Sequence, residues 1–189
     1  MTEDQIYANI PILETERLIL RKLKEEDLQD MHAYGSDEQV SKYVSWDTHQ
    51  SLEDTKRFLY SILEQYDKKQ NVFWAIEWKE NNRLIGTINF VSWSPKHKKA
   101  EIGYVLSRDY WGRGIMTEAM NTVIKFGFEH MDLVRLEARA MAENIGSYRV
   151  MEKVGMTYEG TIRKGMLTKG HHRDLRLYSI LKEEYLTHG

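Results

Sequence analysis

The sequence contains no cysteine among its 189 residues. Without cysteine the chain cannot form a disulfide, a thiolate nucleophile or a cysteine-ligated zinc site. Proteins of a reducing compartment manage without disulfides, so we expect a cytoplasmic protein. The first eleven residues also lack the basic start and apolar run of a secretory signal peptide.

Long apolar runs and an excess of positive charge are missing as well. No stretch approaches the roughly 20 apolar residues needed to cross a bilayer, so we expect no membrane insertion. The formal net charge is −2, whereas nucleic-acid-binding proteins usually carry a basic face, so we expect no direct nucleic-acid binding. The basic run at 96–99 lies between two expected strands, which favours a solvated hairpin tip over a phosphate contact.

What remains is the composition of one globular domain. Hydrophobic residues make up 41% of the chain and charged residues 30%, both ordinary for a soluble protein with its own core. We find no internal repeat, low-complexity segment or interior linker. Residues 1–189 are therefore predicted to form a single domain.

Hydrophobic periodicity predicts a mixed α/β domain. Helical spacing follows Glu25 and Ser51, and Ser51 with Asp54 matches a capping box. Alternation with period two predicts three successive strands at 72–78, 84–93 and 101–106, and their short connections favour an antiparallel meander. Further strands are expected at 18–21, 134–141, 157–162 and 175–181, and further helices from about residue 115 and after residue 144.

The stretch from Ala100 to Met120 combines a strand, a glycine turn and a helix. The turn is Trp111-Gly112-Arg113-Gly114, and the helix is expected from about Ile115. Two glycines let the backbone approach a ligand closely, and the free N–H groups at a helix start attract anions. The pattern predicts an anion site with phosphate as the favoured ligand. A tight turn that binds nothing is the alternative.

Two common nucleotide-binding motifs are excluded at this turn. A dinucleotide fingerprint would need a third glycine where Thr117 stands, and it would follow the first strand of a βαβ unit. The Walker P-loop pattern is absent from the chain. The rest of the sequence must therefore identify the ligand that carries the anionic group.

Several short motifs occur in one order along the chain. They are ETERLILR at 14–21, AEIGYV at 100–105, YWGRGI at 110–115, TEA at 117–119, N-x-x-S at 144–147, EKVGM at 152–156 and DLRLYSIL at 174–181. Together they resemble the GNAT superfamily of acyl-CoA-dependent N-acyltransferases, and within it the RimJ/RimL type of ribosomal-protein N-terminal acetyltransferases. The resemblance covers about residues 14 to 185. It implies an α+β fold with a mixed, mostly antiparallel sheet that splays at its central strands and is flanked by helices.

The resemblance implies acetyl-CoA as a co-substrate and no metal. The pantetheine arm would run beside the strand that ends with Val105 and Leu106, where this strand splays from the strand at 134–141. Asn144 resembles the residue that hydrogen-bonds the pantetheine, and Ser147 shares this part of the site. The pyrophosphate would contact the backbone of the turn and helix start, with the Arg113 side chain adding a charge; these residues are Gly112, Arg113, Gly114, Ile115, Met116 and Thr117.

Three residues are predicted to act in the reaction. The resemblance implies that the Leu106 N–H polarises the thioester carbonyl. It also implies that Ser147 protonates the departing thiolate, and a helix N-cap is the alternative role for this serine. Glu101 is the candidate general base, although a water chain can serve instead and an ion pair with a lysine of the 96–99 run is the structural alternative.

The favoured function is direct acetyl transfer to a primary amine, with the N-terminal amine of a protein as the preferred acceptor. A small-molecule amine, such as a polyamine, amino acid or antibiotic, is the nearest alternative. A non-catalytic acyl-CoA-binding or sensor protein is the alternative from another class. We expect a monomer or homodimer. The run His171-His172-Arg173-Asp174 is interpreted as a turn rather than a metal site, and Asp174 and Tyr178 as structural hydrogen-bonding residues.

Overall fold

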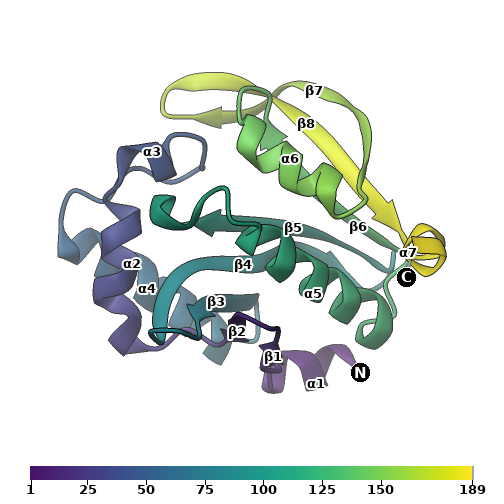
Figure 1. The fold of residues 1–189 in the computed structure, drawn as a ribbon, viewed down its shortest axis with the longest axis horizontal. Coiled ribbons are helices and arrows are strands. Elements are labelled where there is room, and N and C mark those ends of the chain that lie inside the picture. Colours follow the sequence, from purple (N-terminus) through teal and green to yellow (C-terminus); the bar gives the residue numbers. More distant parts are fainter. Residues whose placement is uncertain (189) are drawn as a thin grey trace.

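The computed structural model describes residues 1–188. Its centre is a single eight-stranded sheet in the order β1-β2-β3-β4-β5-β6-β8-β7 (Figure 1). Every neighbouring pair is antiparallel except β5 and β6, which are parallel. The strands are β1 (Leu13–Glu14), β2 (Leu18–Arg21), β3 (Val72–Trp78), β4 (Arg83–Ser94), β5 (Lys99–Leu106), β6 (Arg135–Met141), β7 (Thr157–Thr168) and β8 (His171–Leu181).

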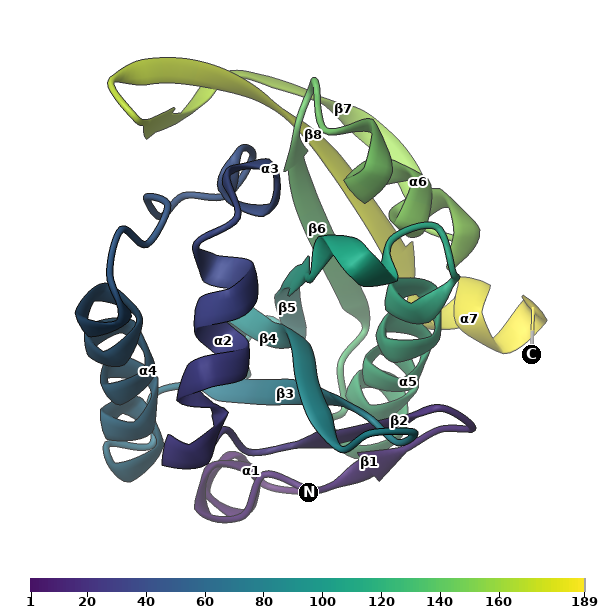
Figure 2. The ribbon, with the colours of Figure 1, turned by 60° about the vertical axis from the view of Figure 1, so that its left-hand side comes forward.

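Helices cover both faces of the sheet (Figure 2). On one face the Tyr66 hydroxyl of α4 donates to the Phe73 carbonyl of β3 at 2.7 Å. On the other face Trp74 packs edge-on against Phe126 of α5. The α-helices are α1 (Glu3–Ala8), α2 (Leu28–Gly35), α3 (Glu38–Ser41), α4 (Leu52–Asp67), α5 (Ile115–His130), α6 (Ile145–Lys153) and α7 (Lys182–His188), and the 3-10 turns are η1 (Glu25–Asp27) and η2 (Arg108–Tyr110).

Most predicted elements are confirmed. Helix α4 starts with the expected capping box, in which the Ser51 hydroxyl accepts from the Asp54 N–H at 3.2 Å. The meander of β3, β4 and β5 is present, and the basic run forms the turn between β4 and β5. One prediction is wrong: His171-His172-Arg173-Asp174 is not a turn, because β8 begins at His171 and the turn lies at 169–170.

The central strands splay apart, as the fold class requires. Parallel pairing between β5 and β6 runs only from Lys99 opposite Arg135 to Ile102 opposite Ala138. Beyond that point β5 stays paired with β4 as far as Leu106, while β6 stays paired with β8. A gap therefore opens between β5 and β6 at their carboxyl ends.

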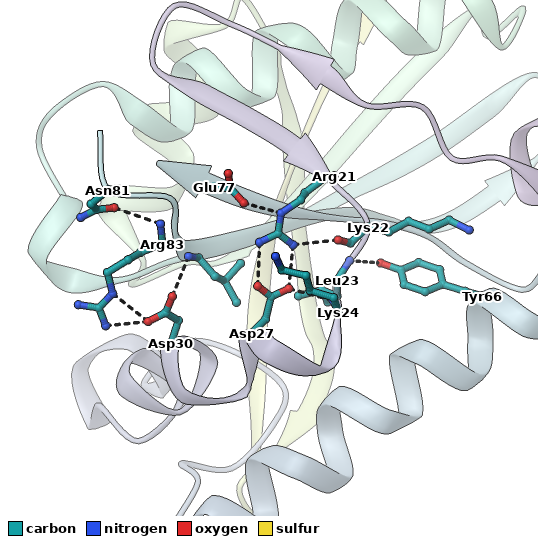
Figure 3. Close-up of polar contacts among 11 residues, drawn as sticks. Arg21, Lys22, Leu23, Lys24, Asp27, Asp30, Tyr66, Glu77, Asn81 and Arg83 are labelled. Atoms are coloured by element: carbon teal, nitrogen blue, oxygen red, sulfur yellow. Dashed lines mark hydrogen bonds and ion pairs between the residues drawn. The ribbon is translucent and has the colours of Figure 1, made fainter. Parts of the chain in front are cut away.

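A buried polar cluster fixes helix α2 against this sheet (Figure 3). The Arg21 guanidinium of β2 donates to both carboxylate oxygens of Asp27, each at 2.8 Å, and to Glu77 of β3. Nearby, Arg83 of β4 donates to Asp30 of α2 at 2.7 and 2.8 Å. The bidentate Arg21–Asp27 pair fixes orientation as well as distance, and the two bonds from Arg83 add to it. They set the position of α2 and hence of α3, which follows it.

Within residues 1–188, no helix combines the length and apolar character that a membrane span requires.

Candidate active site

The glycine turn forms the start of α5. Gly112 and Gly114 have φ values of +75° and +73°, a region that costs other residues about 1–2 kcal/mol. Gly114 is the N-cap and offers no side chain, so no side-chain cap engages the N–H groups at the helix start. These donors and the positive end of a 16-residue helix together create a site for an anion.

The turn is anchored from the first strand region. Glu118 of α5 accepts hydrogen bonds from the Arg17 backbone N–H at 3.1 Å, from Arg17 Nε at 2.7 Å and from the Thr15 hydroxyl at 2.5 Å. Arg17 Nη1 in turn donates to the Arg113 carbonyl in the turn at 3.0 Å. Arg17 therefore connects the glycine turn to the first turn of α5 through a chain of charged hydrogen bonds.

A cavity of about 640 Å³ lies beside this turn and the splay. It is walled by the end of β5, the start of α5, the turn and helix α6, and the segment around α3. All the predicted co-substrate-binding residues line it except Arg113; they are Val105, Leu106, Gly112, Gly114, Ile115, Met116, Thr117, Asn144 and Ser147.

The Arg113 side chain is directed elsewhere. Its guanidinium carbon lies 5.5 Å from the centre of the Tyr110 ring, and the side chain is absent from the lining of the cavity. What Arg113 contributes at the turn is its backbone carbonyl, which Arg17 holds. The predicted charged contact from Arg113 is therefore not part of the site in this structure.

The backbone of Leu106 faces the splay. The next N–H, that of Ser107, donates to the Ile85 carbonyl of β4 at 2.7 Å. Because N–H groups of successive strand residues point to alternate sides, the Leu106 N–H points away from β4. The Leu106 carbonyl, on the same side, accepts from the Trp111 indole at 2.8 Å. The N–H predicted to polarise a thioester thus points toward the gap between β5 and β6.

Asn144, Ser147 and Tyr104 form a hydrogen-bonded group in the cavity wall. Asn144 is the N-cap of α6, and its side-chain oxygen accepts from the Ser147 N–H at 3.2 Å. Ser147 is therefore not the cap, and its alternative structural role is wrong. The Ser147 hydroxyl instead donates to the Tyr104 hydroxyl at 3.0 Å, which donates to the Ser147 carbonyl at 2.9 Å.

Tyr104 is a site residue that the sequence analysis missed. Burial raises the pKa of Tyr104, and the hydrogen bond with Ser147 offsets only part of this rise. The hydroxyl is consequently held as a neutral phenol at physiological pH. Tyr104 stands inside the AEIGYV motif, but strand alternation alone does not reveal which distant side chain it meets.

Glu101 is not brought into the cavity. Its carboxylate lies 3.6 Å from Arg139 and is not among the groups lining the cavity, so its partner is an arginine of β6 rather than a lysine of the 96–99 run. Burial, the largest cause, and the neighbouring Glu137 raise the pKa of Glu101, whereas Arg139 and Lys99 lower it. Glu101 lies five positions from Leu106 on β5, about 17 Å along an extended strand, so its role as general base stays a prediction.

Two basic residues and an aromatic segment complete the cavity. Arg149 and Lys153 of α6 line it and offer the positive charge that Arg113 does not. Val40, Tyr43 and Val44 close it from the side of α3. The helical spacing of Arg149 and Lys153, four residues apart, was the available signal for the basic pair.

Near the end of the chain, Asp174 and Tyr178 are predicted to make structural hydrogen bonds. The Tyr178 hydroxyl donates to Glu152 at 3.2 Å, and Asp174 accepts from the Lys164 N–H at 2.7 Å, so both make the structural hydrogen bonds expected of them. No group of three or more His, Asp or Glu residues is placed to hold a metal ion in the part of the chain that the structure describes.

The donor set fits coenzyme A. Unpaired helix N–H groups and two basic side chains suit its phosphates, and the splayed strand edge suits the amides of a pantetheine arm. A hydrophobic lining from Val105, Leu106, Ile115 and Met116 suits its aliphatic parts.

Comparisons with known proteins agree with this chemistry. Residues 17–157 match the model of the acetyltransferase (GNAT) domain family. The uncharacterized N-acetyltransferase YoaA of Bacillus subtilis is 34% identical over 172 residues, which is 91% of this chain and 97% of that protein. YdaF of B. subtilis, provisionally assigned as a ribosomal N-acetyltransferase, is 37% identical over 102 residues, 54% of this chain and 56% of that protein.

A solved structure is similar in both sequence and fold. The crystal structure of a GNAT-family acetyltransferase from Bacillus anthracis has a TM-score of 0.80 and 33% identity, and the match covers 92% of this chain and 99% of that one. With the domain model matching most of the chain, the family is established. The chain belongs to the GNAT family of acetyltransferases and is an acetyltransferase enzyme.

Proposed function

We propose that this enzyme transfers the acetyl group of acetyl-CoA directly to a primary amine, with the N-terminal amine of a protein as the favoured acceptor. The observation that carries the proposal is one cavity in which the glycine turn, the Leu106 N–H and the Tyr104–Ser147 pair meet. Direct transfer is supported by the absence of cysteine, which leaves no thiol to carry an acyl group.

The residues divide into binding and reaction roles. The N–H groups from Gly112 to Thr117 bind the pyrophosphate, and Asn144 contacts the pantetheine while capping α6. The Leu106 N–H hydrogen-bonds the thioester carbonyl and stabilises negative charge on its oxygen. Ser147 donates a proton to the departing thiolate and regains one from the water that accepts the amine proton, and Tyr104 holds the serine hydroxyl in position.

Water carries the proton away from the amine. An amine must be neutral to attack, and a base must lie within hydrogen-bond reach of its proton or be connected through water. Because Glu101 lies about 17 Å along the strand from Leu106, proton transfer from an amine at Leu106 to Glu101 needs intervening water molecules. We therefore assign the first proton transfer to water, with Glu101 at most a distant acceptor.

The motifs and one relative favour a protein N-terminus as the acceptor. The RimJ/RimL-type motifs and the provisional assignment of YdaF both support a protein N-terminus. A small-molecule amine remains the alternative substrate on the same fold. A silent acyl-CoA sensor would not need the Tyr104–Ser147 pair, which argues for catalysis. We place the reaction in the cytoplasm, in a monomer or homodimer.

One assay separates these possibilities. CoA release from acetyl-CoA is measured with a panel of peptides that have free N-termini and a panel of small amines, including spermidine and free amino acids. Release with peptides alone supports the proposed acceptor, and release with small amines alone supports the alternative. Binding of acetyl-CoA without release in any sample would identify a sensor.

A further inference from the structure

A second, smaller cavity adjoins the first. It has a volume of about 180 Å³ and is lined by Lys42, Tyr43, Met141, Glu143 and Arg173. Tyr43 and Glu143 also line the larger cavity, so the two spaces share a wall. Glu143 directly precedes Asn144, which places the small cavity beside the end of the active site that holds the proposed proton donor.

Two cations with few competing partners line this small cavity. The Arg173 guanidinium has a loose ion pair with Glu143, 3.9 Å long, and its side chain is 40% exposed. The Lys42 ammonium lies 5.1 Å from the centre of the Tyr43 ring and is exposed. Pairs this exposed contribute little to stability, so both cations are free to bind a ligand.

The tip of the β7–β8 hairpin brings these two cations together. Figures 1 and 2 show the hairpin reaching across toward α3. At its tip Lys169 donates to the Ser41 carbonyl at the end of α3, and the Thr168 hydroxyl to the Ser45 carbonyl at 3.5 Å. Thr168 is only 6% exposed although it lies at a hairpin tip, which indicates a packed contact. Lys42 follows Ser41, and Arg173 follows the tip along β8.

The hairpin has a charge opposite to that of the whole chain. Residues 163–176 contain five Lys or Arg residues and one Asp, a formal net charge of +4, whereas the chain has −2. Asp174 is engaged with the Lys164 N–H. The approach to the small cavity is therefore positive, which attracts anions and repels polycations.

We propose that the small cavity is a subsite for a carboxylate that the acceptor carries close to its amine, bound by Lys42 and Arg173. This inference rests on the proposed function and specifies its substrate class. The volume, about that of six water molecules, accommodates a short acidic side chain or a free carboxyl group. Glu143, which lines both cavities, offers a negative charge to the amine group of such an acceptor. Polyamines, which have no carboxylate, are poor acceptors.

The test uses the full chain with saturating acetyl-CoA and five-residue peptide amides that differ only at their second position. Glutamate there should give a KM about three- to tenfold lower than glutamine, and lysine a higher one. Free alanine compared with alanine amide tests the other source of a carboxylate. A lower KM for the glutamate peptide than for the glutamine peptide identifies an acidic side chain as the ligand. A lower KM for alanine than for alanine amide identifies a free carboxyl group as the ligand.

Variants connect the preference to the subsite. Arg173→Gln and Lys42→Gln should each remove most of it while the KM for acetyl-CoA stays unchanged, which also shows that the variants fold. Arg173→Glu should shift the preference toward the lysine peptide. Lys68→Gln, at an exposed ion pair with Glu64 at the end of α4, is the matched control and should retain the wild-type preference.

Three results would overturn the subsite. The first is equal KM values for the glutamate and glutamine peptides, together with equal KM values for alanine and its amide. The second is a wild-type preference for lysine or spermidine. The third is a carboxylate preference that survives in both Arg173→Gln and Lys42→Gln. In each of these cases CoA is still released, so the proposed function stands. Absence of release with every amine contradicts the proposed function itself, and the subsite falls with it.

Discussion

The hydroxyl groups of Tyr104 and Ser147 lie 3.0 Å apart, although 43 residues separate them in the chain. Tyr104 is on β5, beside the splay, and Ser147 is in the first turn of α6. Their contact connects the strand that would support the thioester to the helix that would supply a proton. It gives the serine a defined orientation in the cavity.

Ser147→Ala should lower kcat more than it lowers the affinity for acetyl-CoA. Loss of a positioned proton donor is expected to reduce kcat on the order of 10- to 100-fold, while the glycine turn still holds the phosphates. Tyr104→Phe is the matched variant, and its effect should be smaller because the serine hydroxyl remains. Steady-state kinetics together with calorimetric binding measure both quantities. An unchanged kcat in Ser147→Ala would remove the serine from the reaction.

Gly114→Glu should abolish CoA binding. The substitution places a negative charge among the phosphate donors and also strains a backbone with φ of +73°. Gly170→Glu is the control for strain, because Gly170 has φ of +75° and nothing within 4 Å of an added Cβ. We expect both variants to lose similar stability in thermal melts, and only Gly114→Glu to lose affinity in calorimetry. Equal CoA affinity in the two variants would contradict the phosphate site.

Arg17→Gln should weaken CoA binding without any direct contact to the ligand. The variant removes the hydrogen bond to the Arg113 carbonyl, so the turn is held less firmly. We expect about a three- to tenfold higher Kd for CoA, from the loss of the partly exposed hydrogen bonds that Arg17 makes to the Arg113 carbonyl and to Glu118. Arg57→Gln, which changes an exposed arginine of α4, should leave the Kd for CoA unchanged. The same Kd for CoA in both variants would show that Arg17 does not hold the glycine turn in its binding conformation.

Glu118 should make the stability of the chain sensitive to acid. Burial pushes its pKa upward, but hydrogen bonds from Thr15 and Arg17 outweigh burial and hold the pKa below its ordinary value. A lowered pKa means that the carboxylate stabilises the fold above its unfolded pKa and loses this contribution as pH falls through the folded one. The stability difference between wild type and Glu118→Gln should thus shrink as pH falls below the ordinary glutamate range. Denaturant melts across this range measure it, and a pH-independent difference would contradict the assignment.

The contribution of Glu101 to stability should have the opposite pH dependence to that of Glu118. Because burial raises its pKa, the ionised carboxylate costs the fold stability at neutral pH, and this cost disappears as pH falls through the folded pKa toward the unfolded one. Glu101→Gln should therefore be more stable than wild type at pH 7, with the gain lost in acid. Its kcat should change by less than about threefold, because water takes the first proton. A large fall in kcat with a shifted pH profile would restore Glu101 as the general base.

The sequence was most informative where the signal is local. Ser51 and Asp54 predicted the start of α4, and the glycines predicted a turn that leads into a helix, because caps and positive φ depend on a few adjacent residues. The splay followed from resemblance alone. Periodicity shows that β5 and β6 are strands but does not show where their pairing ends.

Relationships across the chain were the ones that sequence reasoning missed. The sequence predicts Tyr104 only as part of a strand, since its partner Ser147 becomes a neighbour only in the folded chain. Glu101 is predicted as the base from its position on the β5 strand, and five positions of extended strand place it about 17 Å from Leu106. Lys42 and Arg173 face one cavity because the β7–β8 hairpin extends to residues 168–171, beyond the strand predicted at 157–162.

The most direct test of the central claim is mass spectrometry of a peptide with a free N-terminus after incubation with acetyl-CoA and the enzyme. Wild-type protein should add one acetyl group to the α-amine and release an equal amount of CoA, and Gly114→Glu should do neither. Tight binding of acetyl-CoA with no acetylated peptide or small amine, over the full panel of acceptors, would contradict the account.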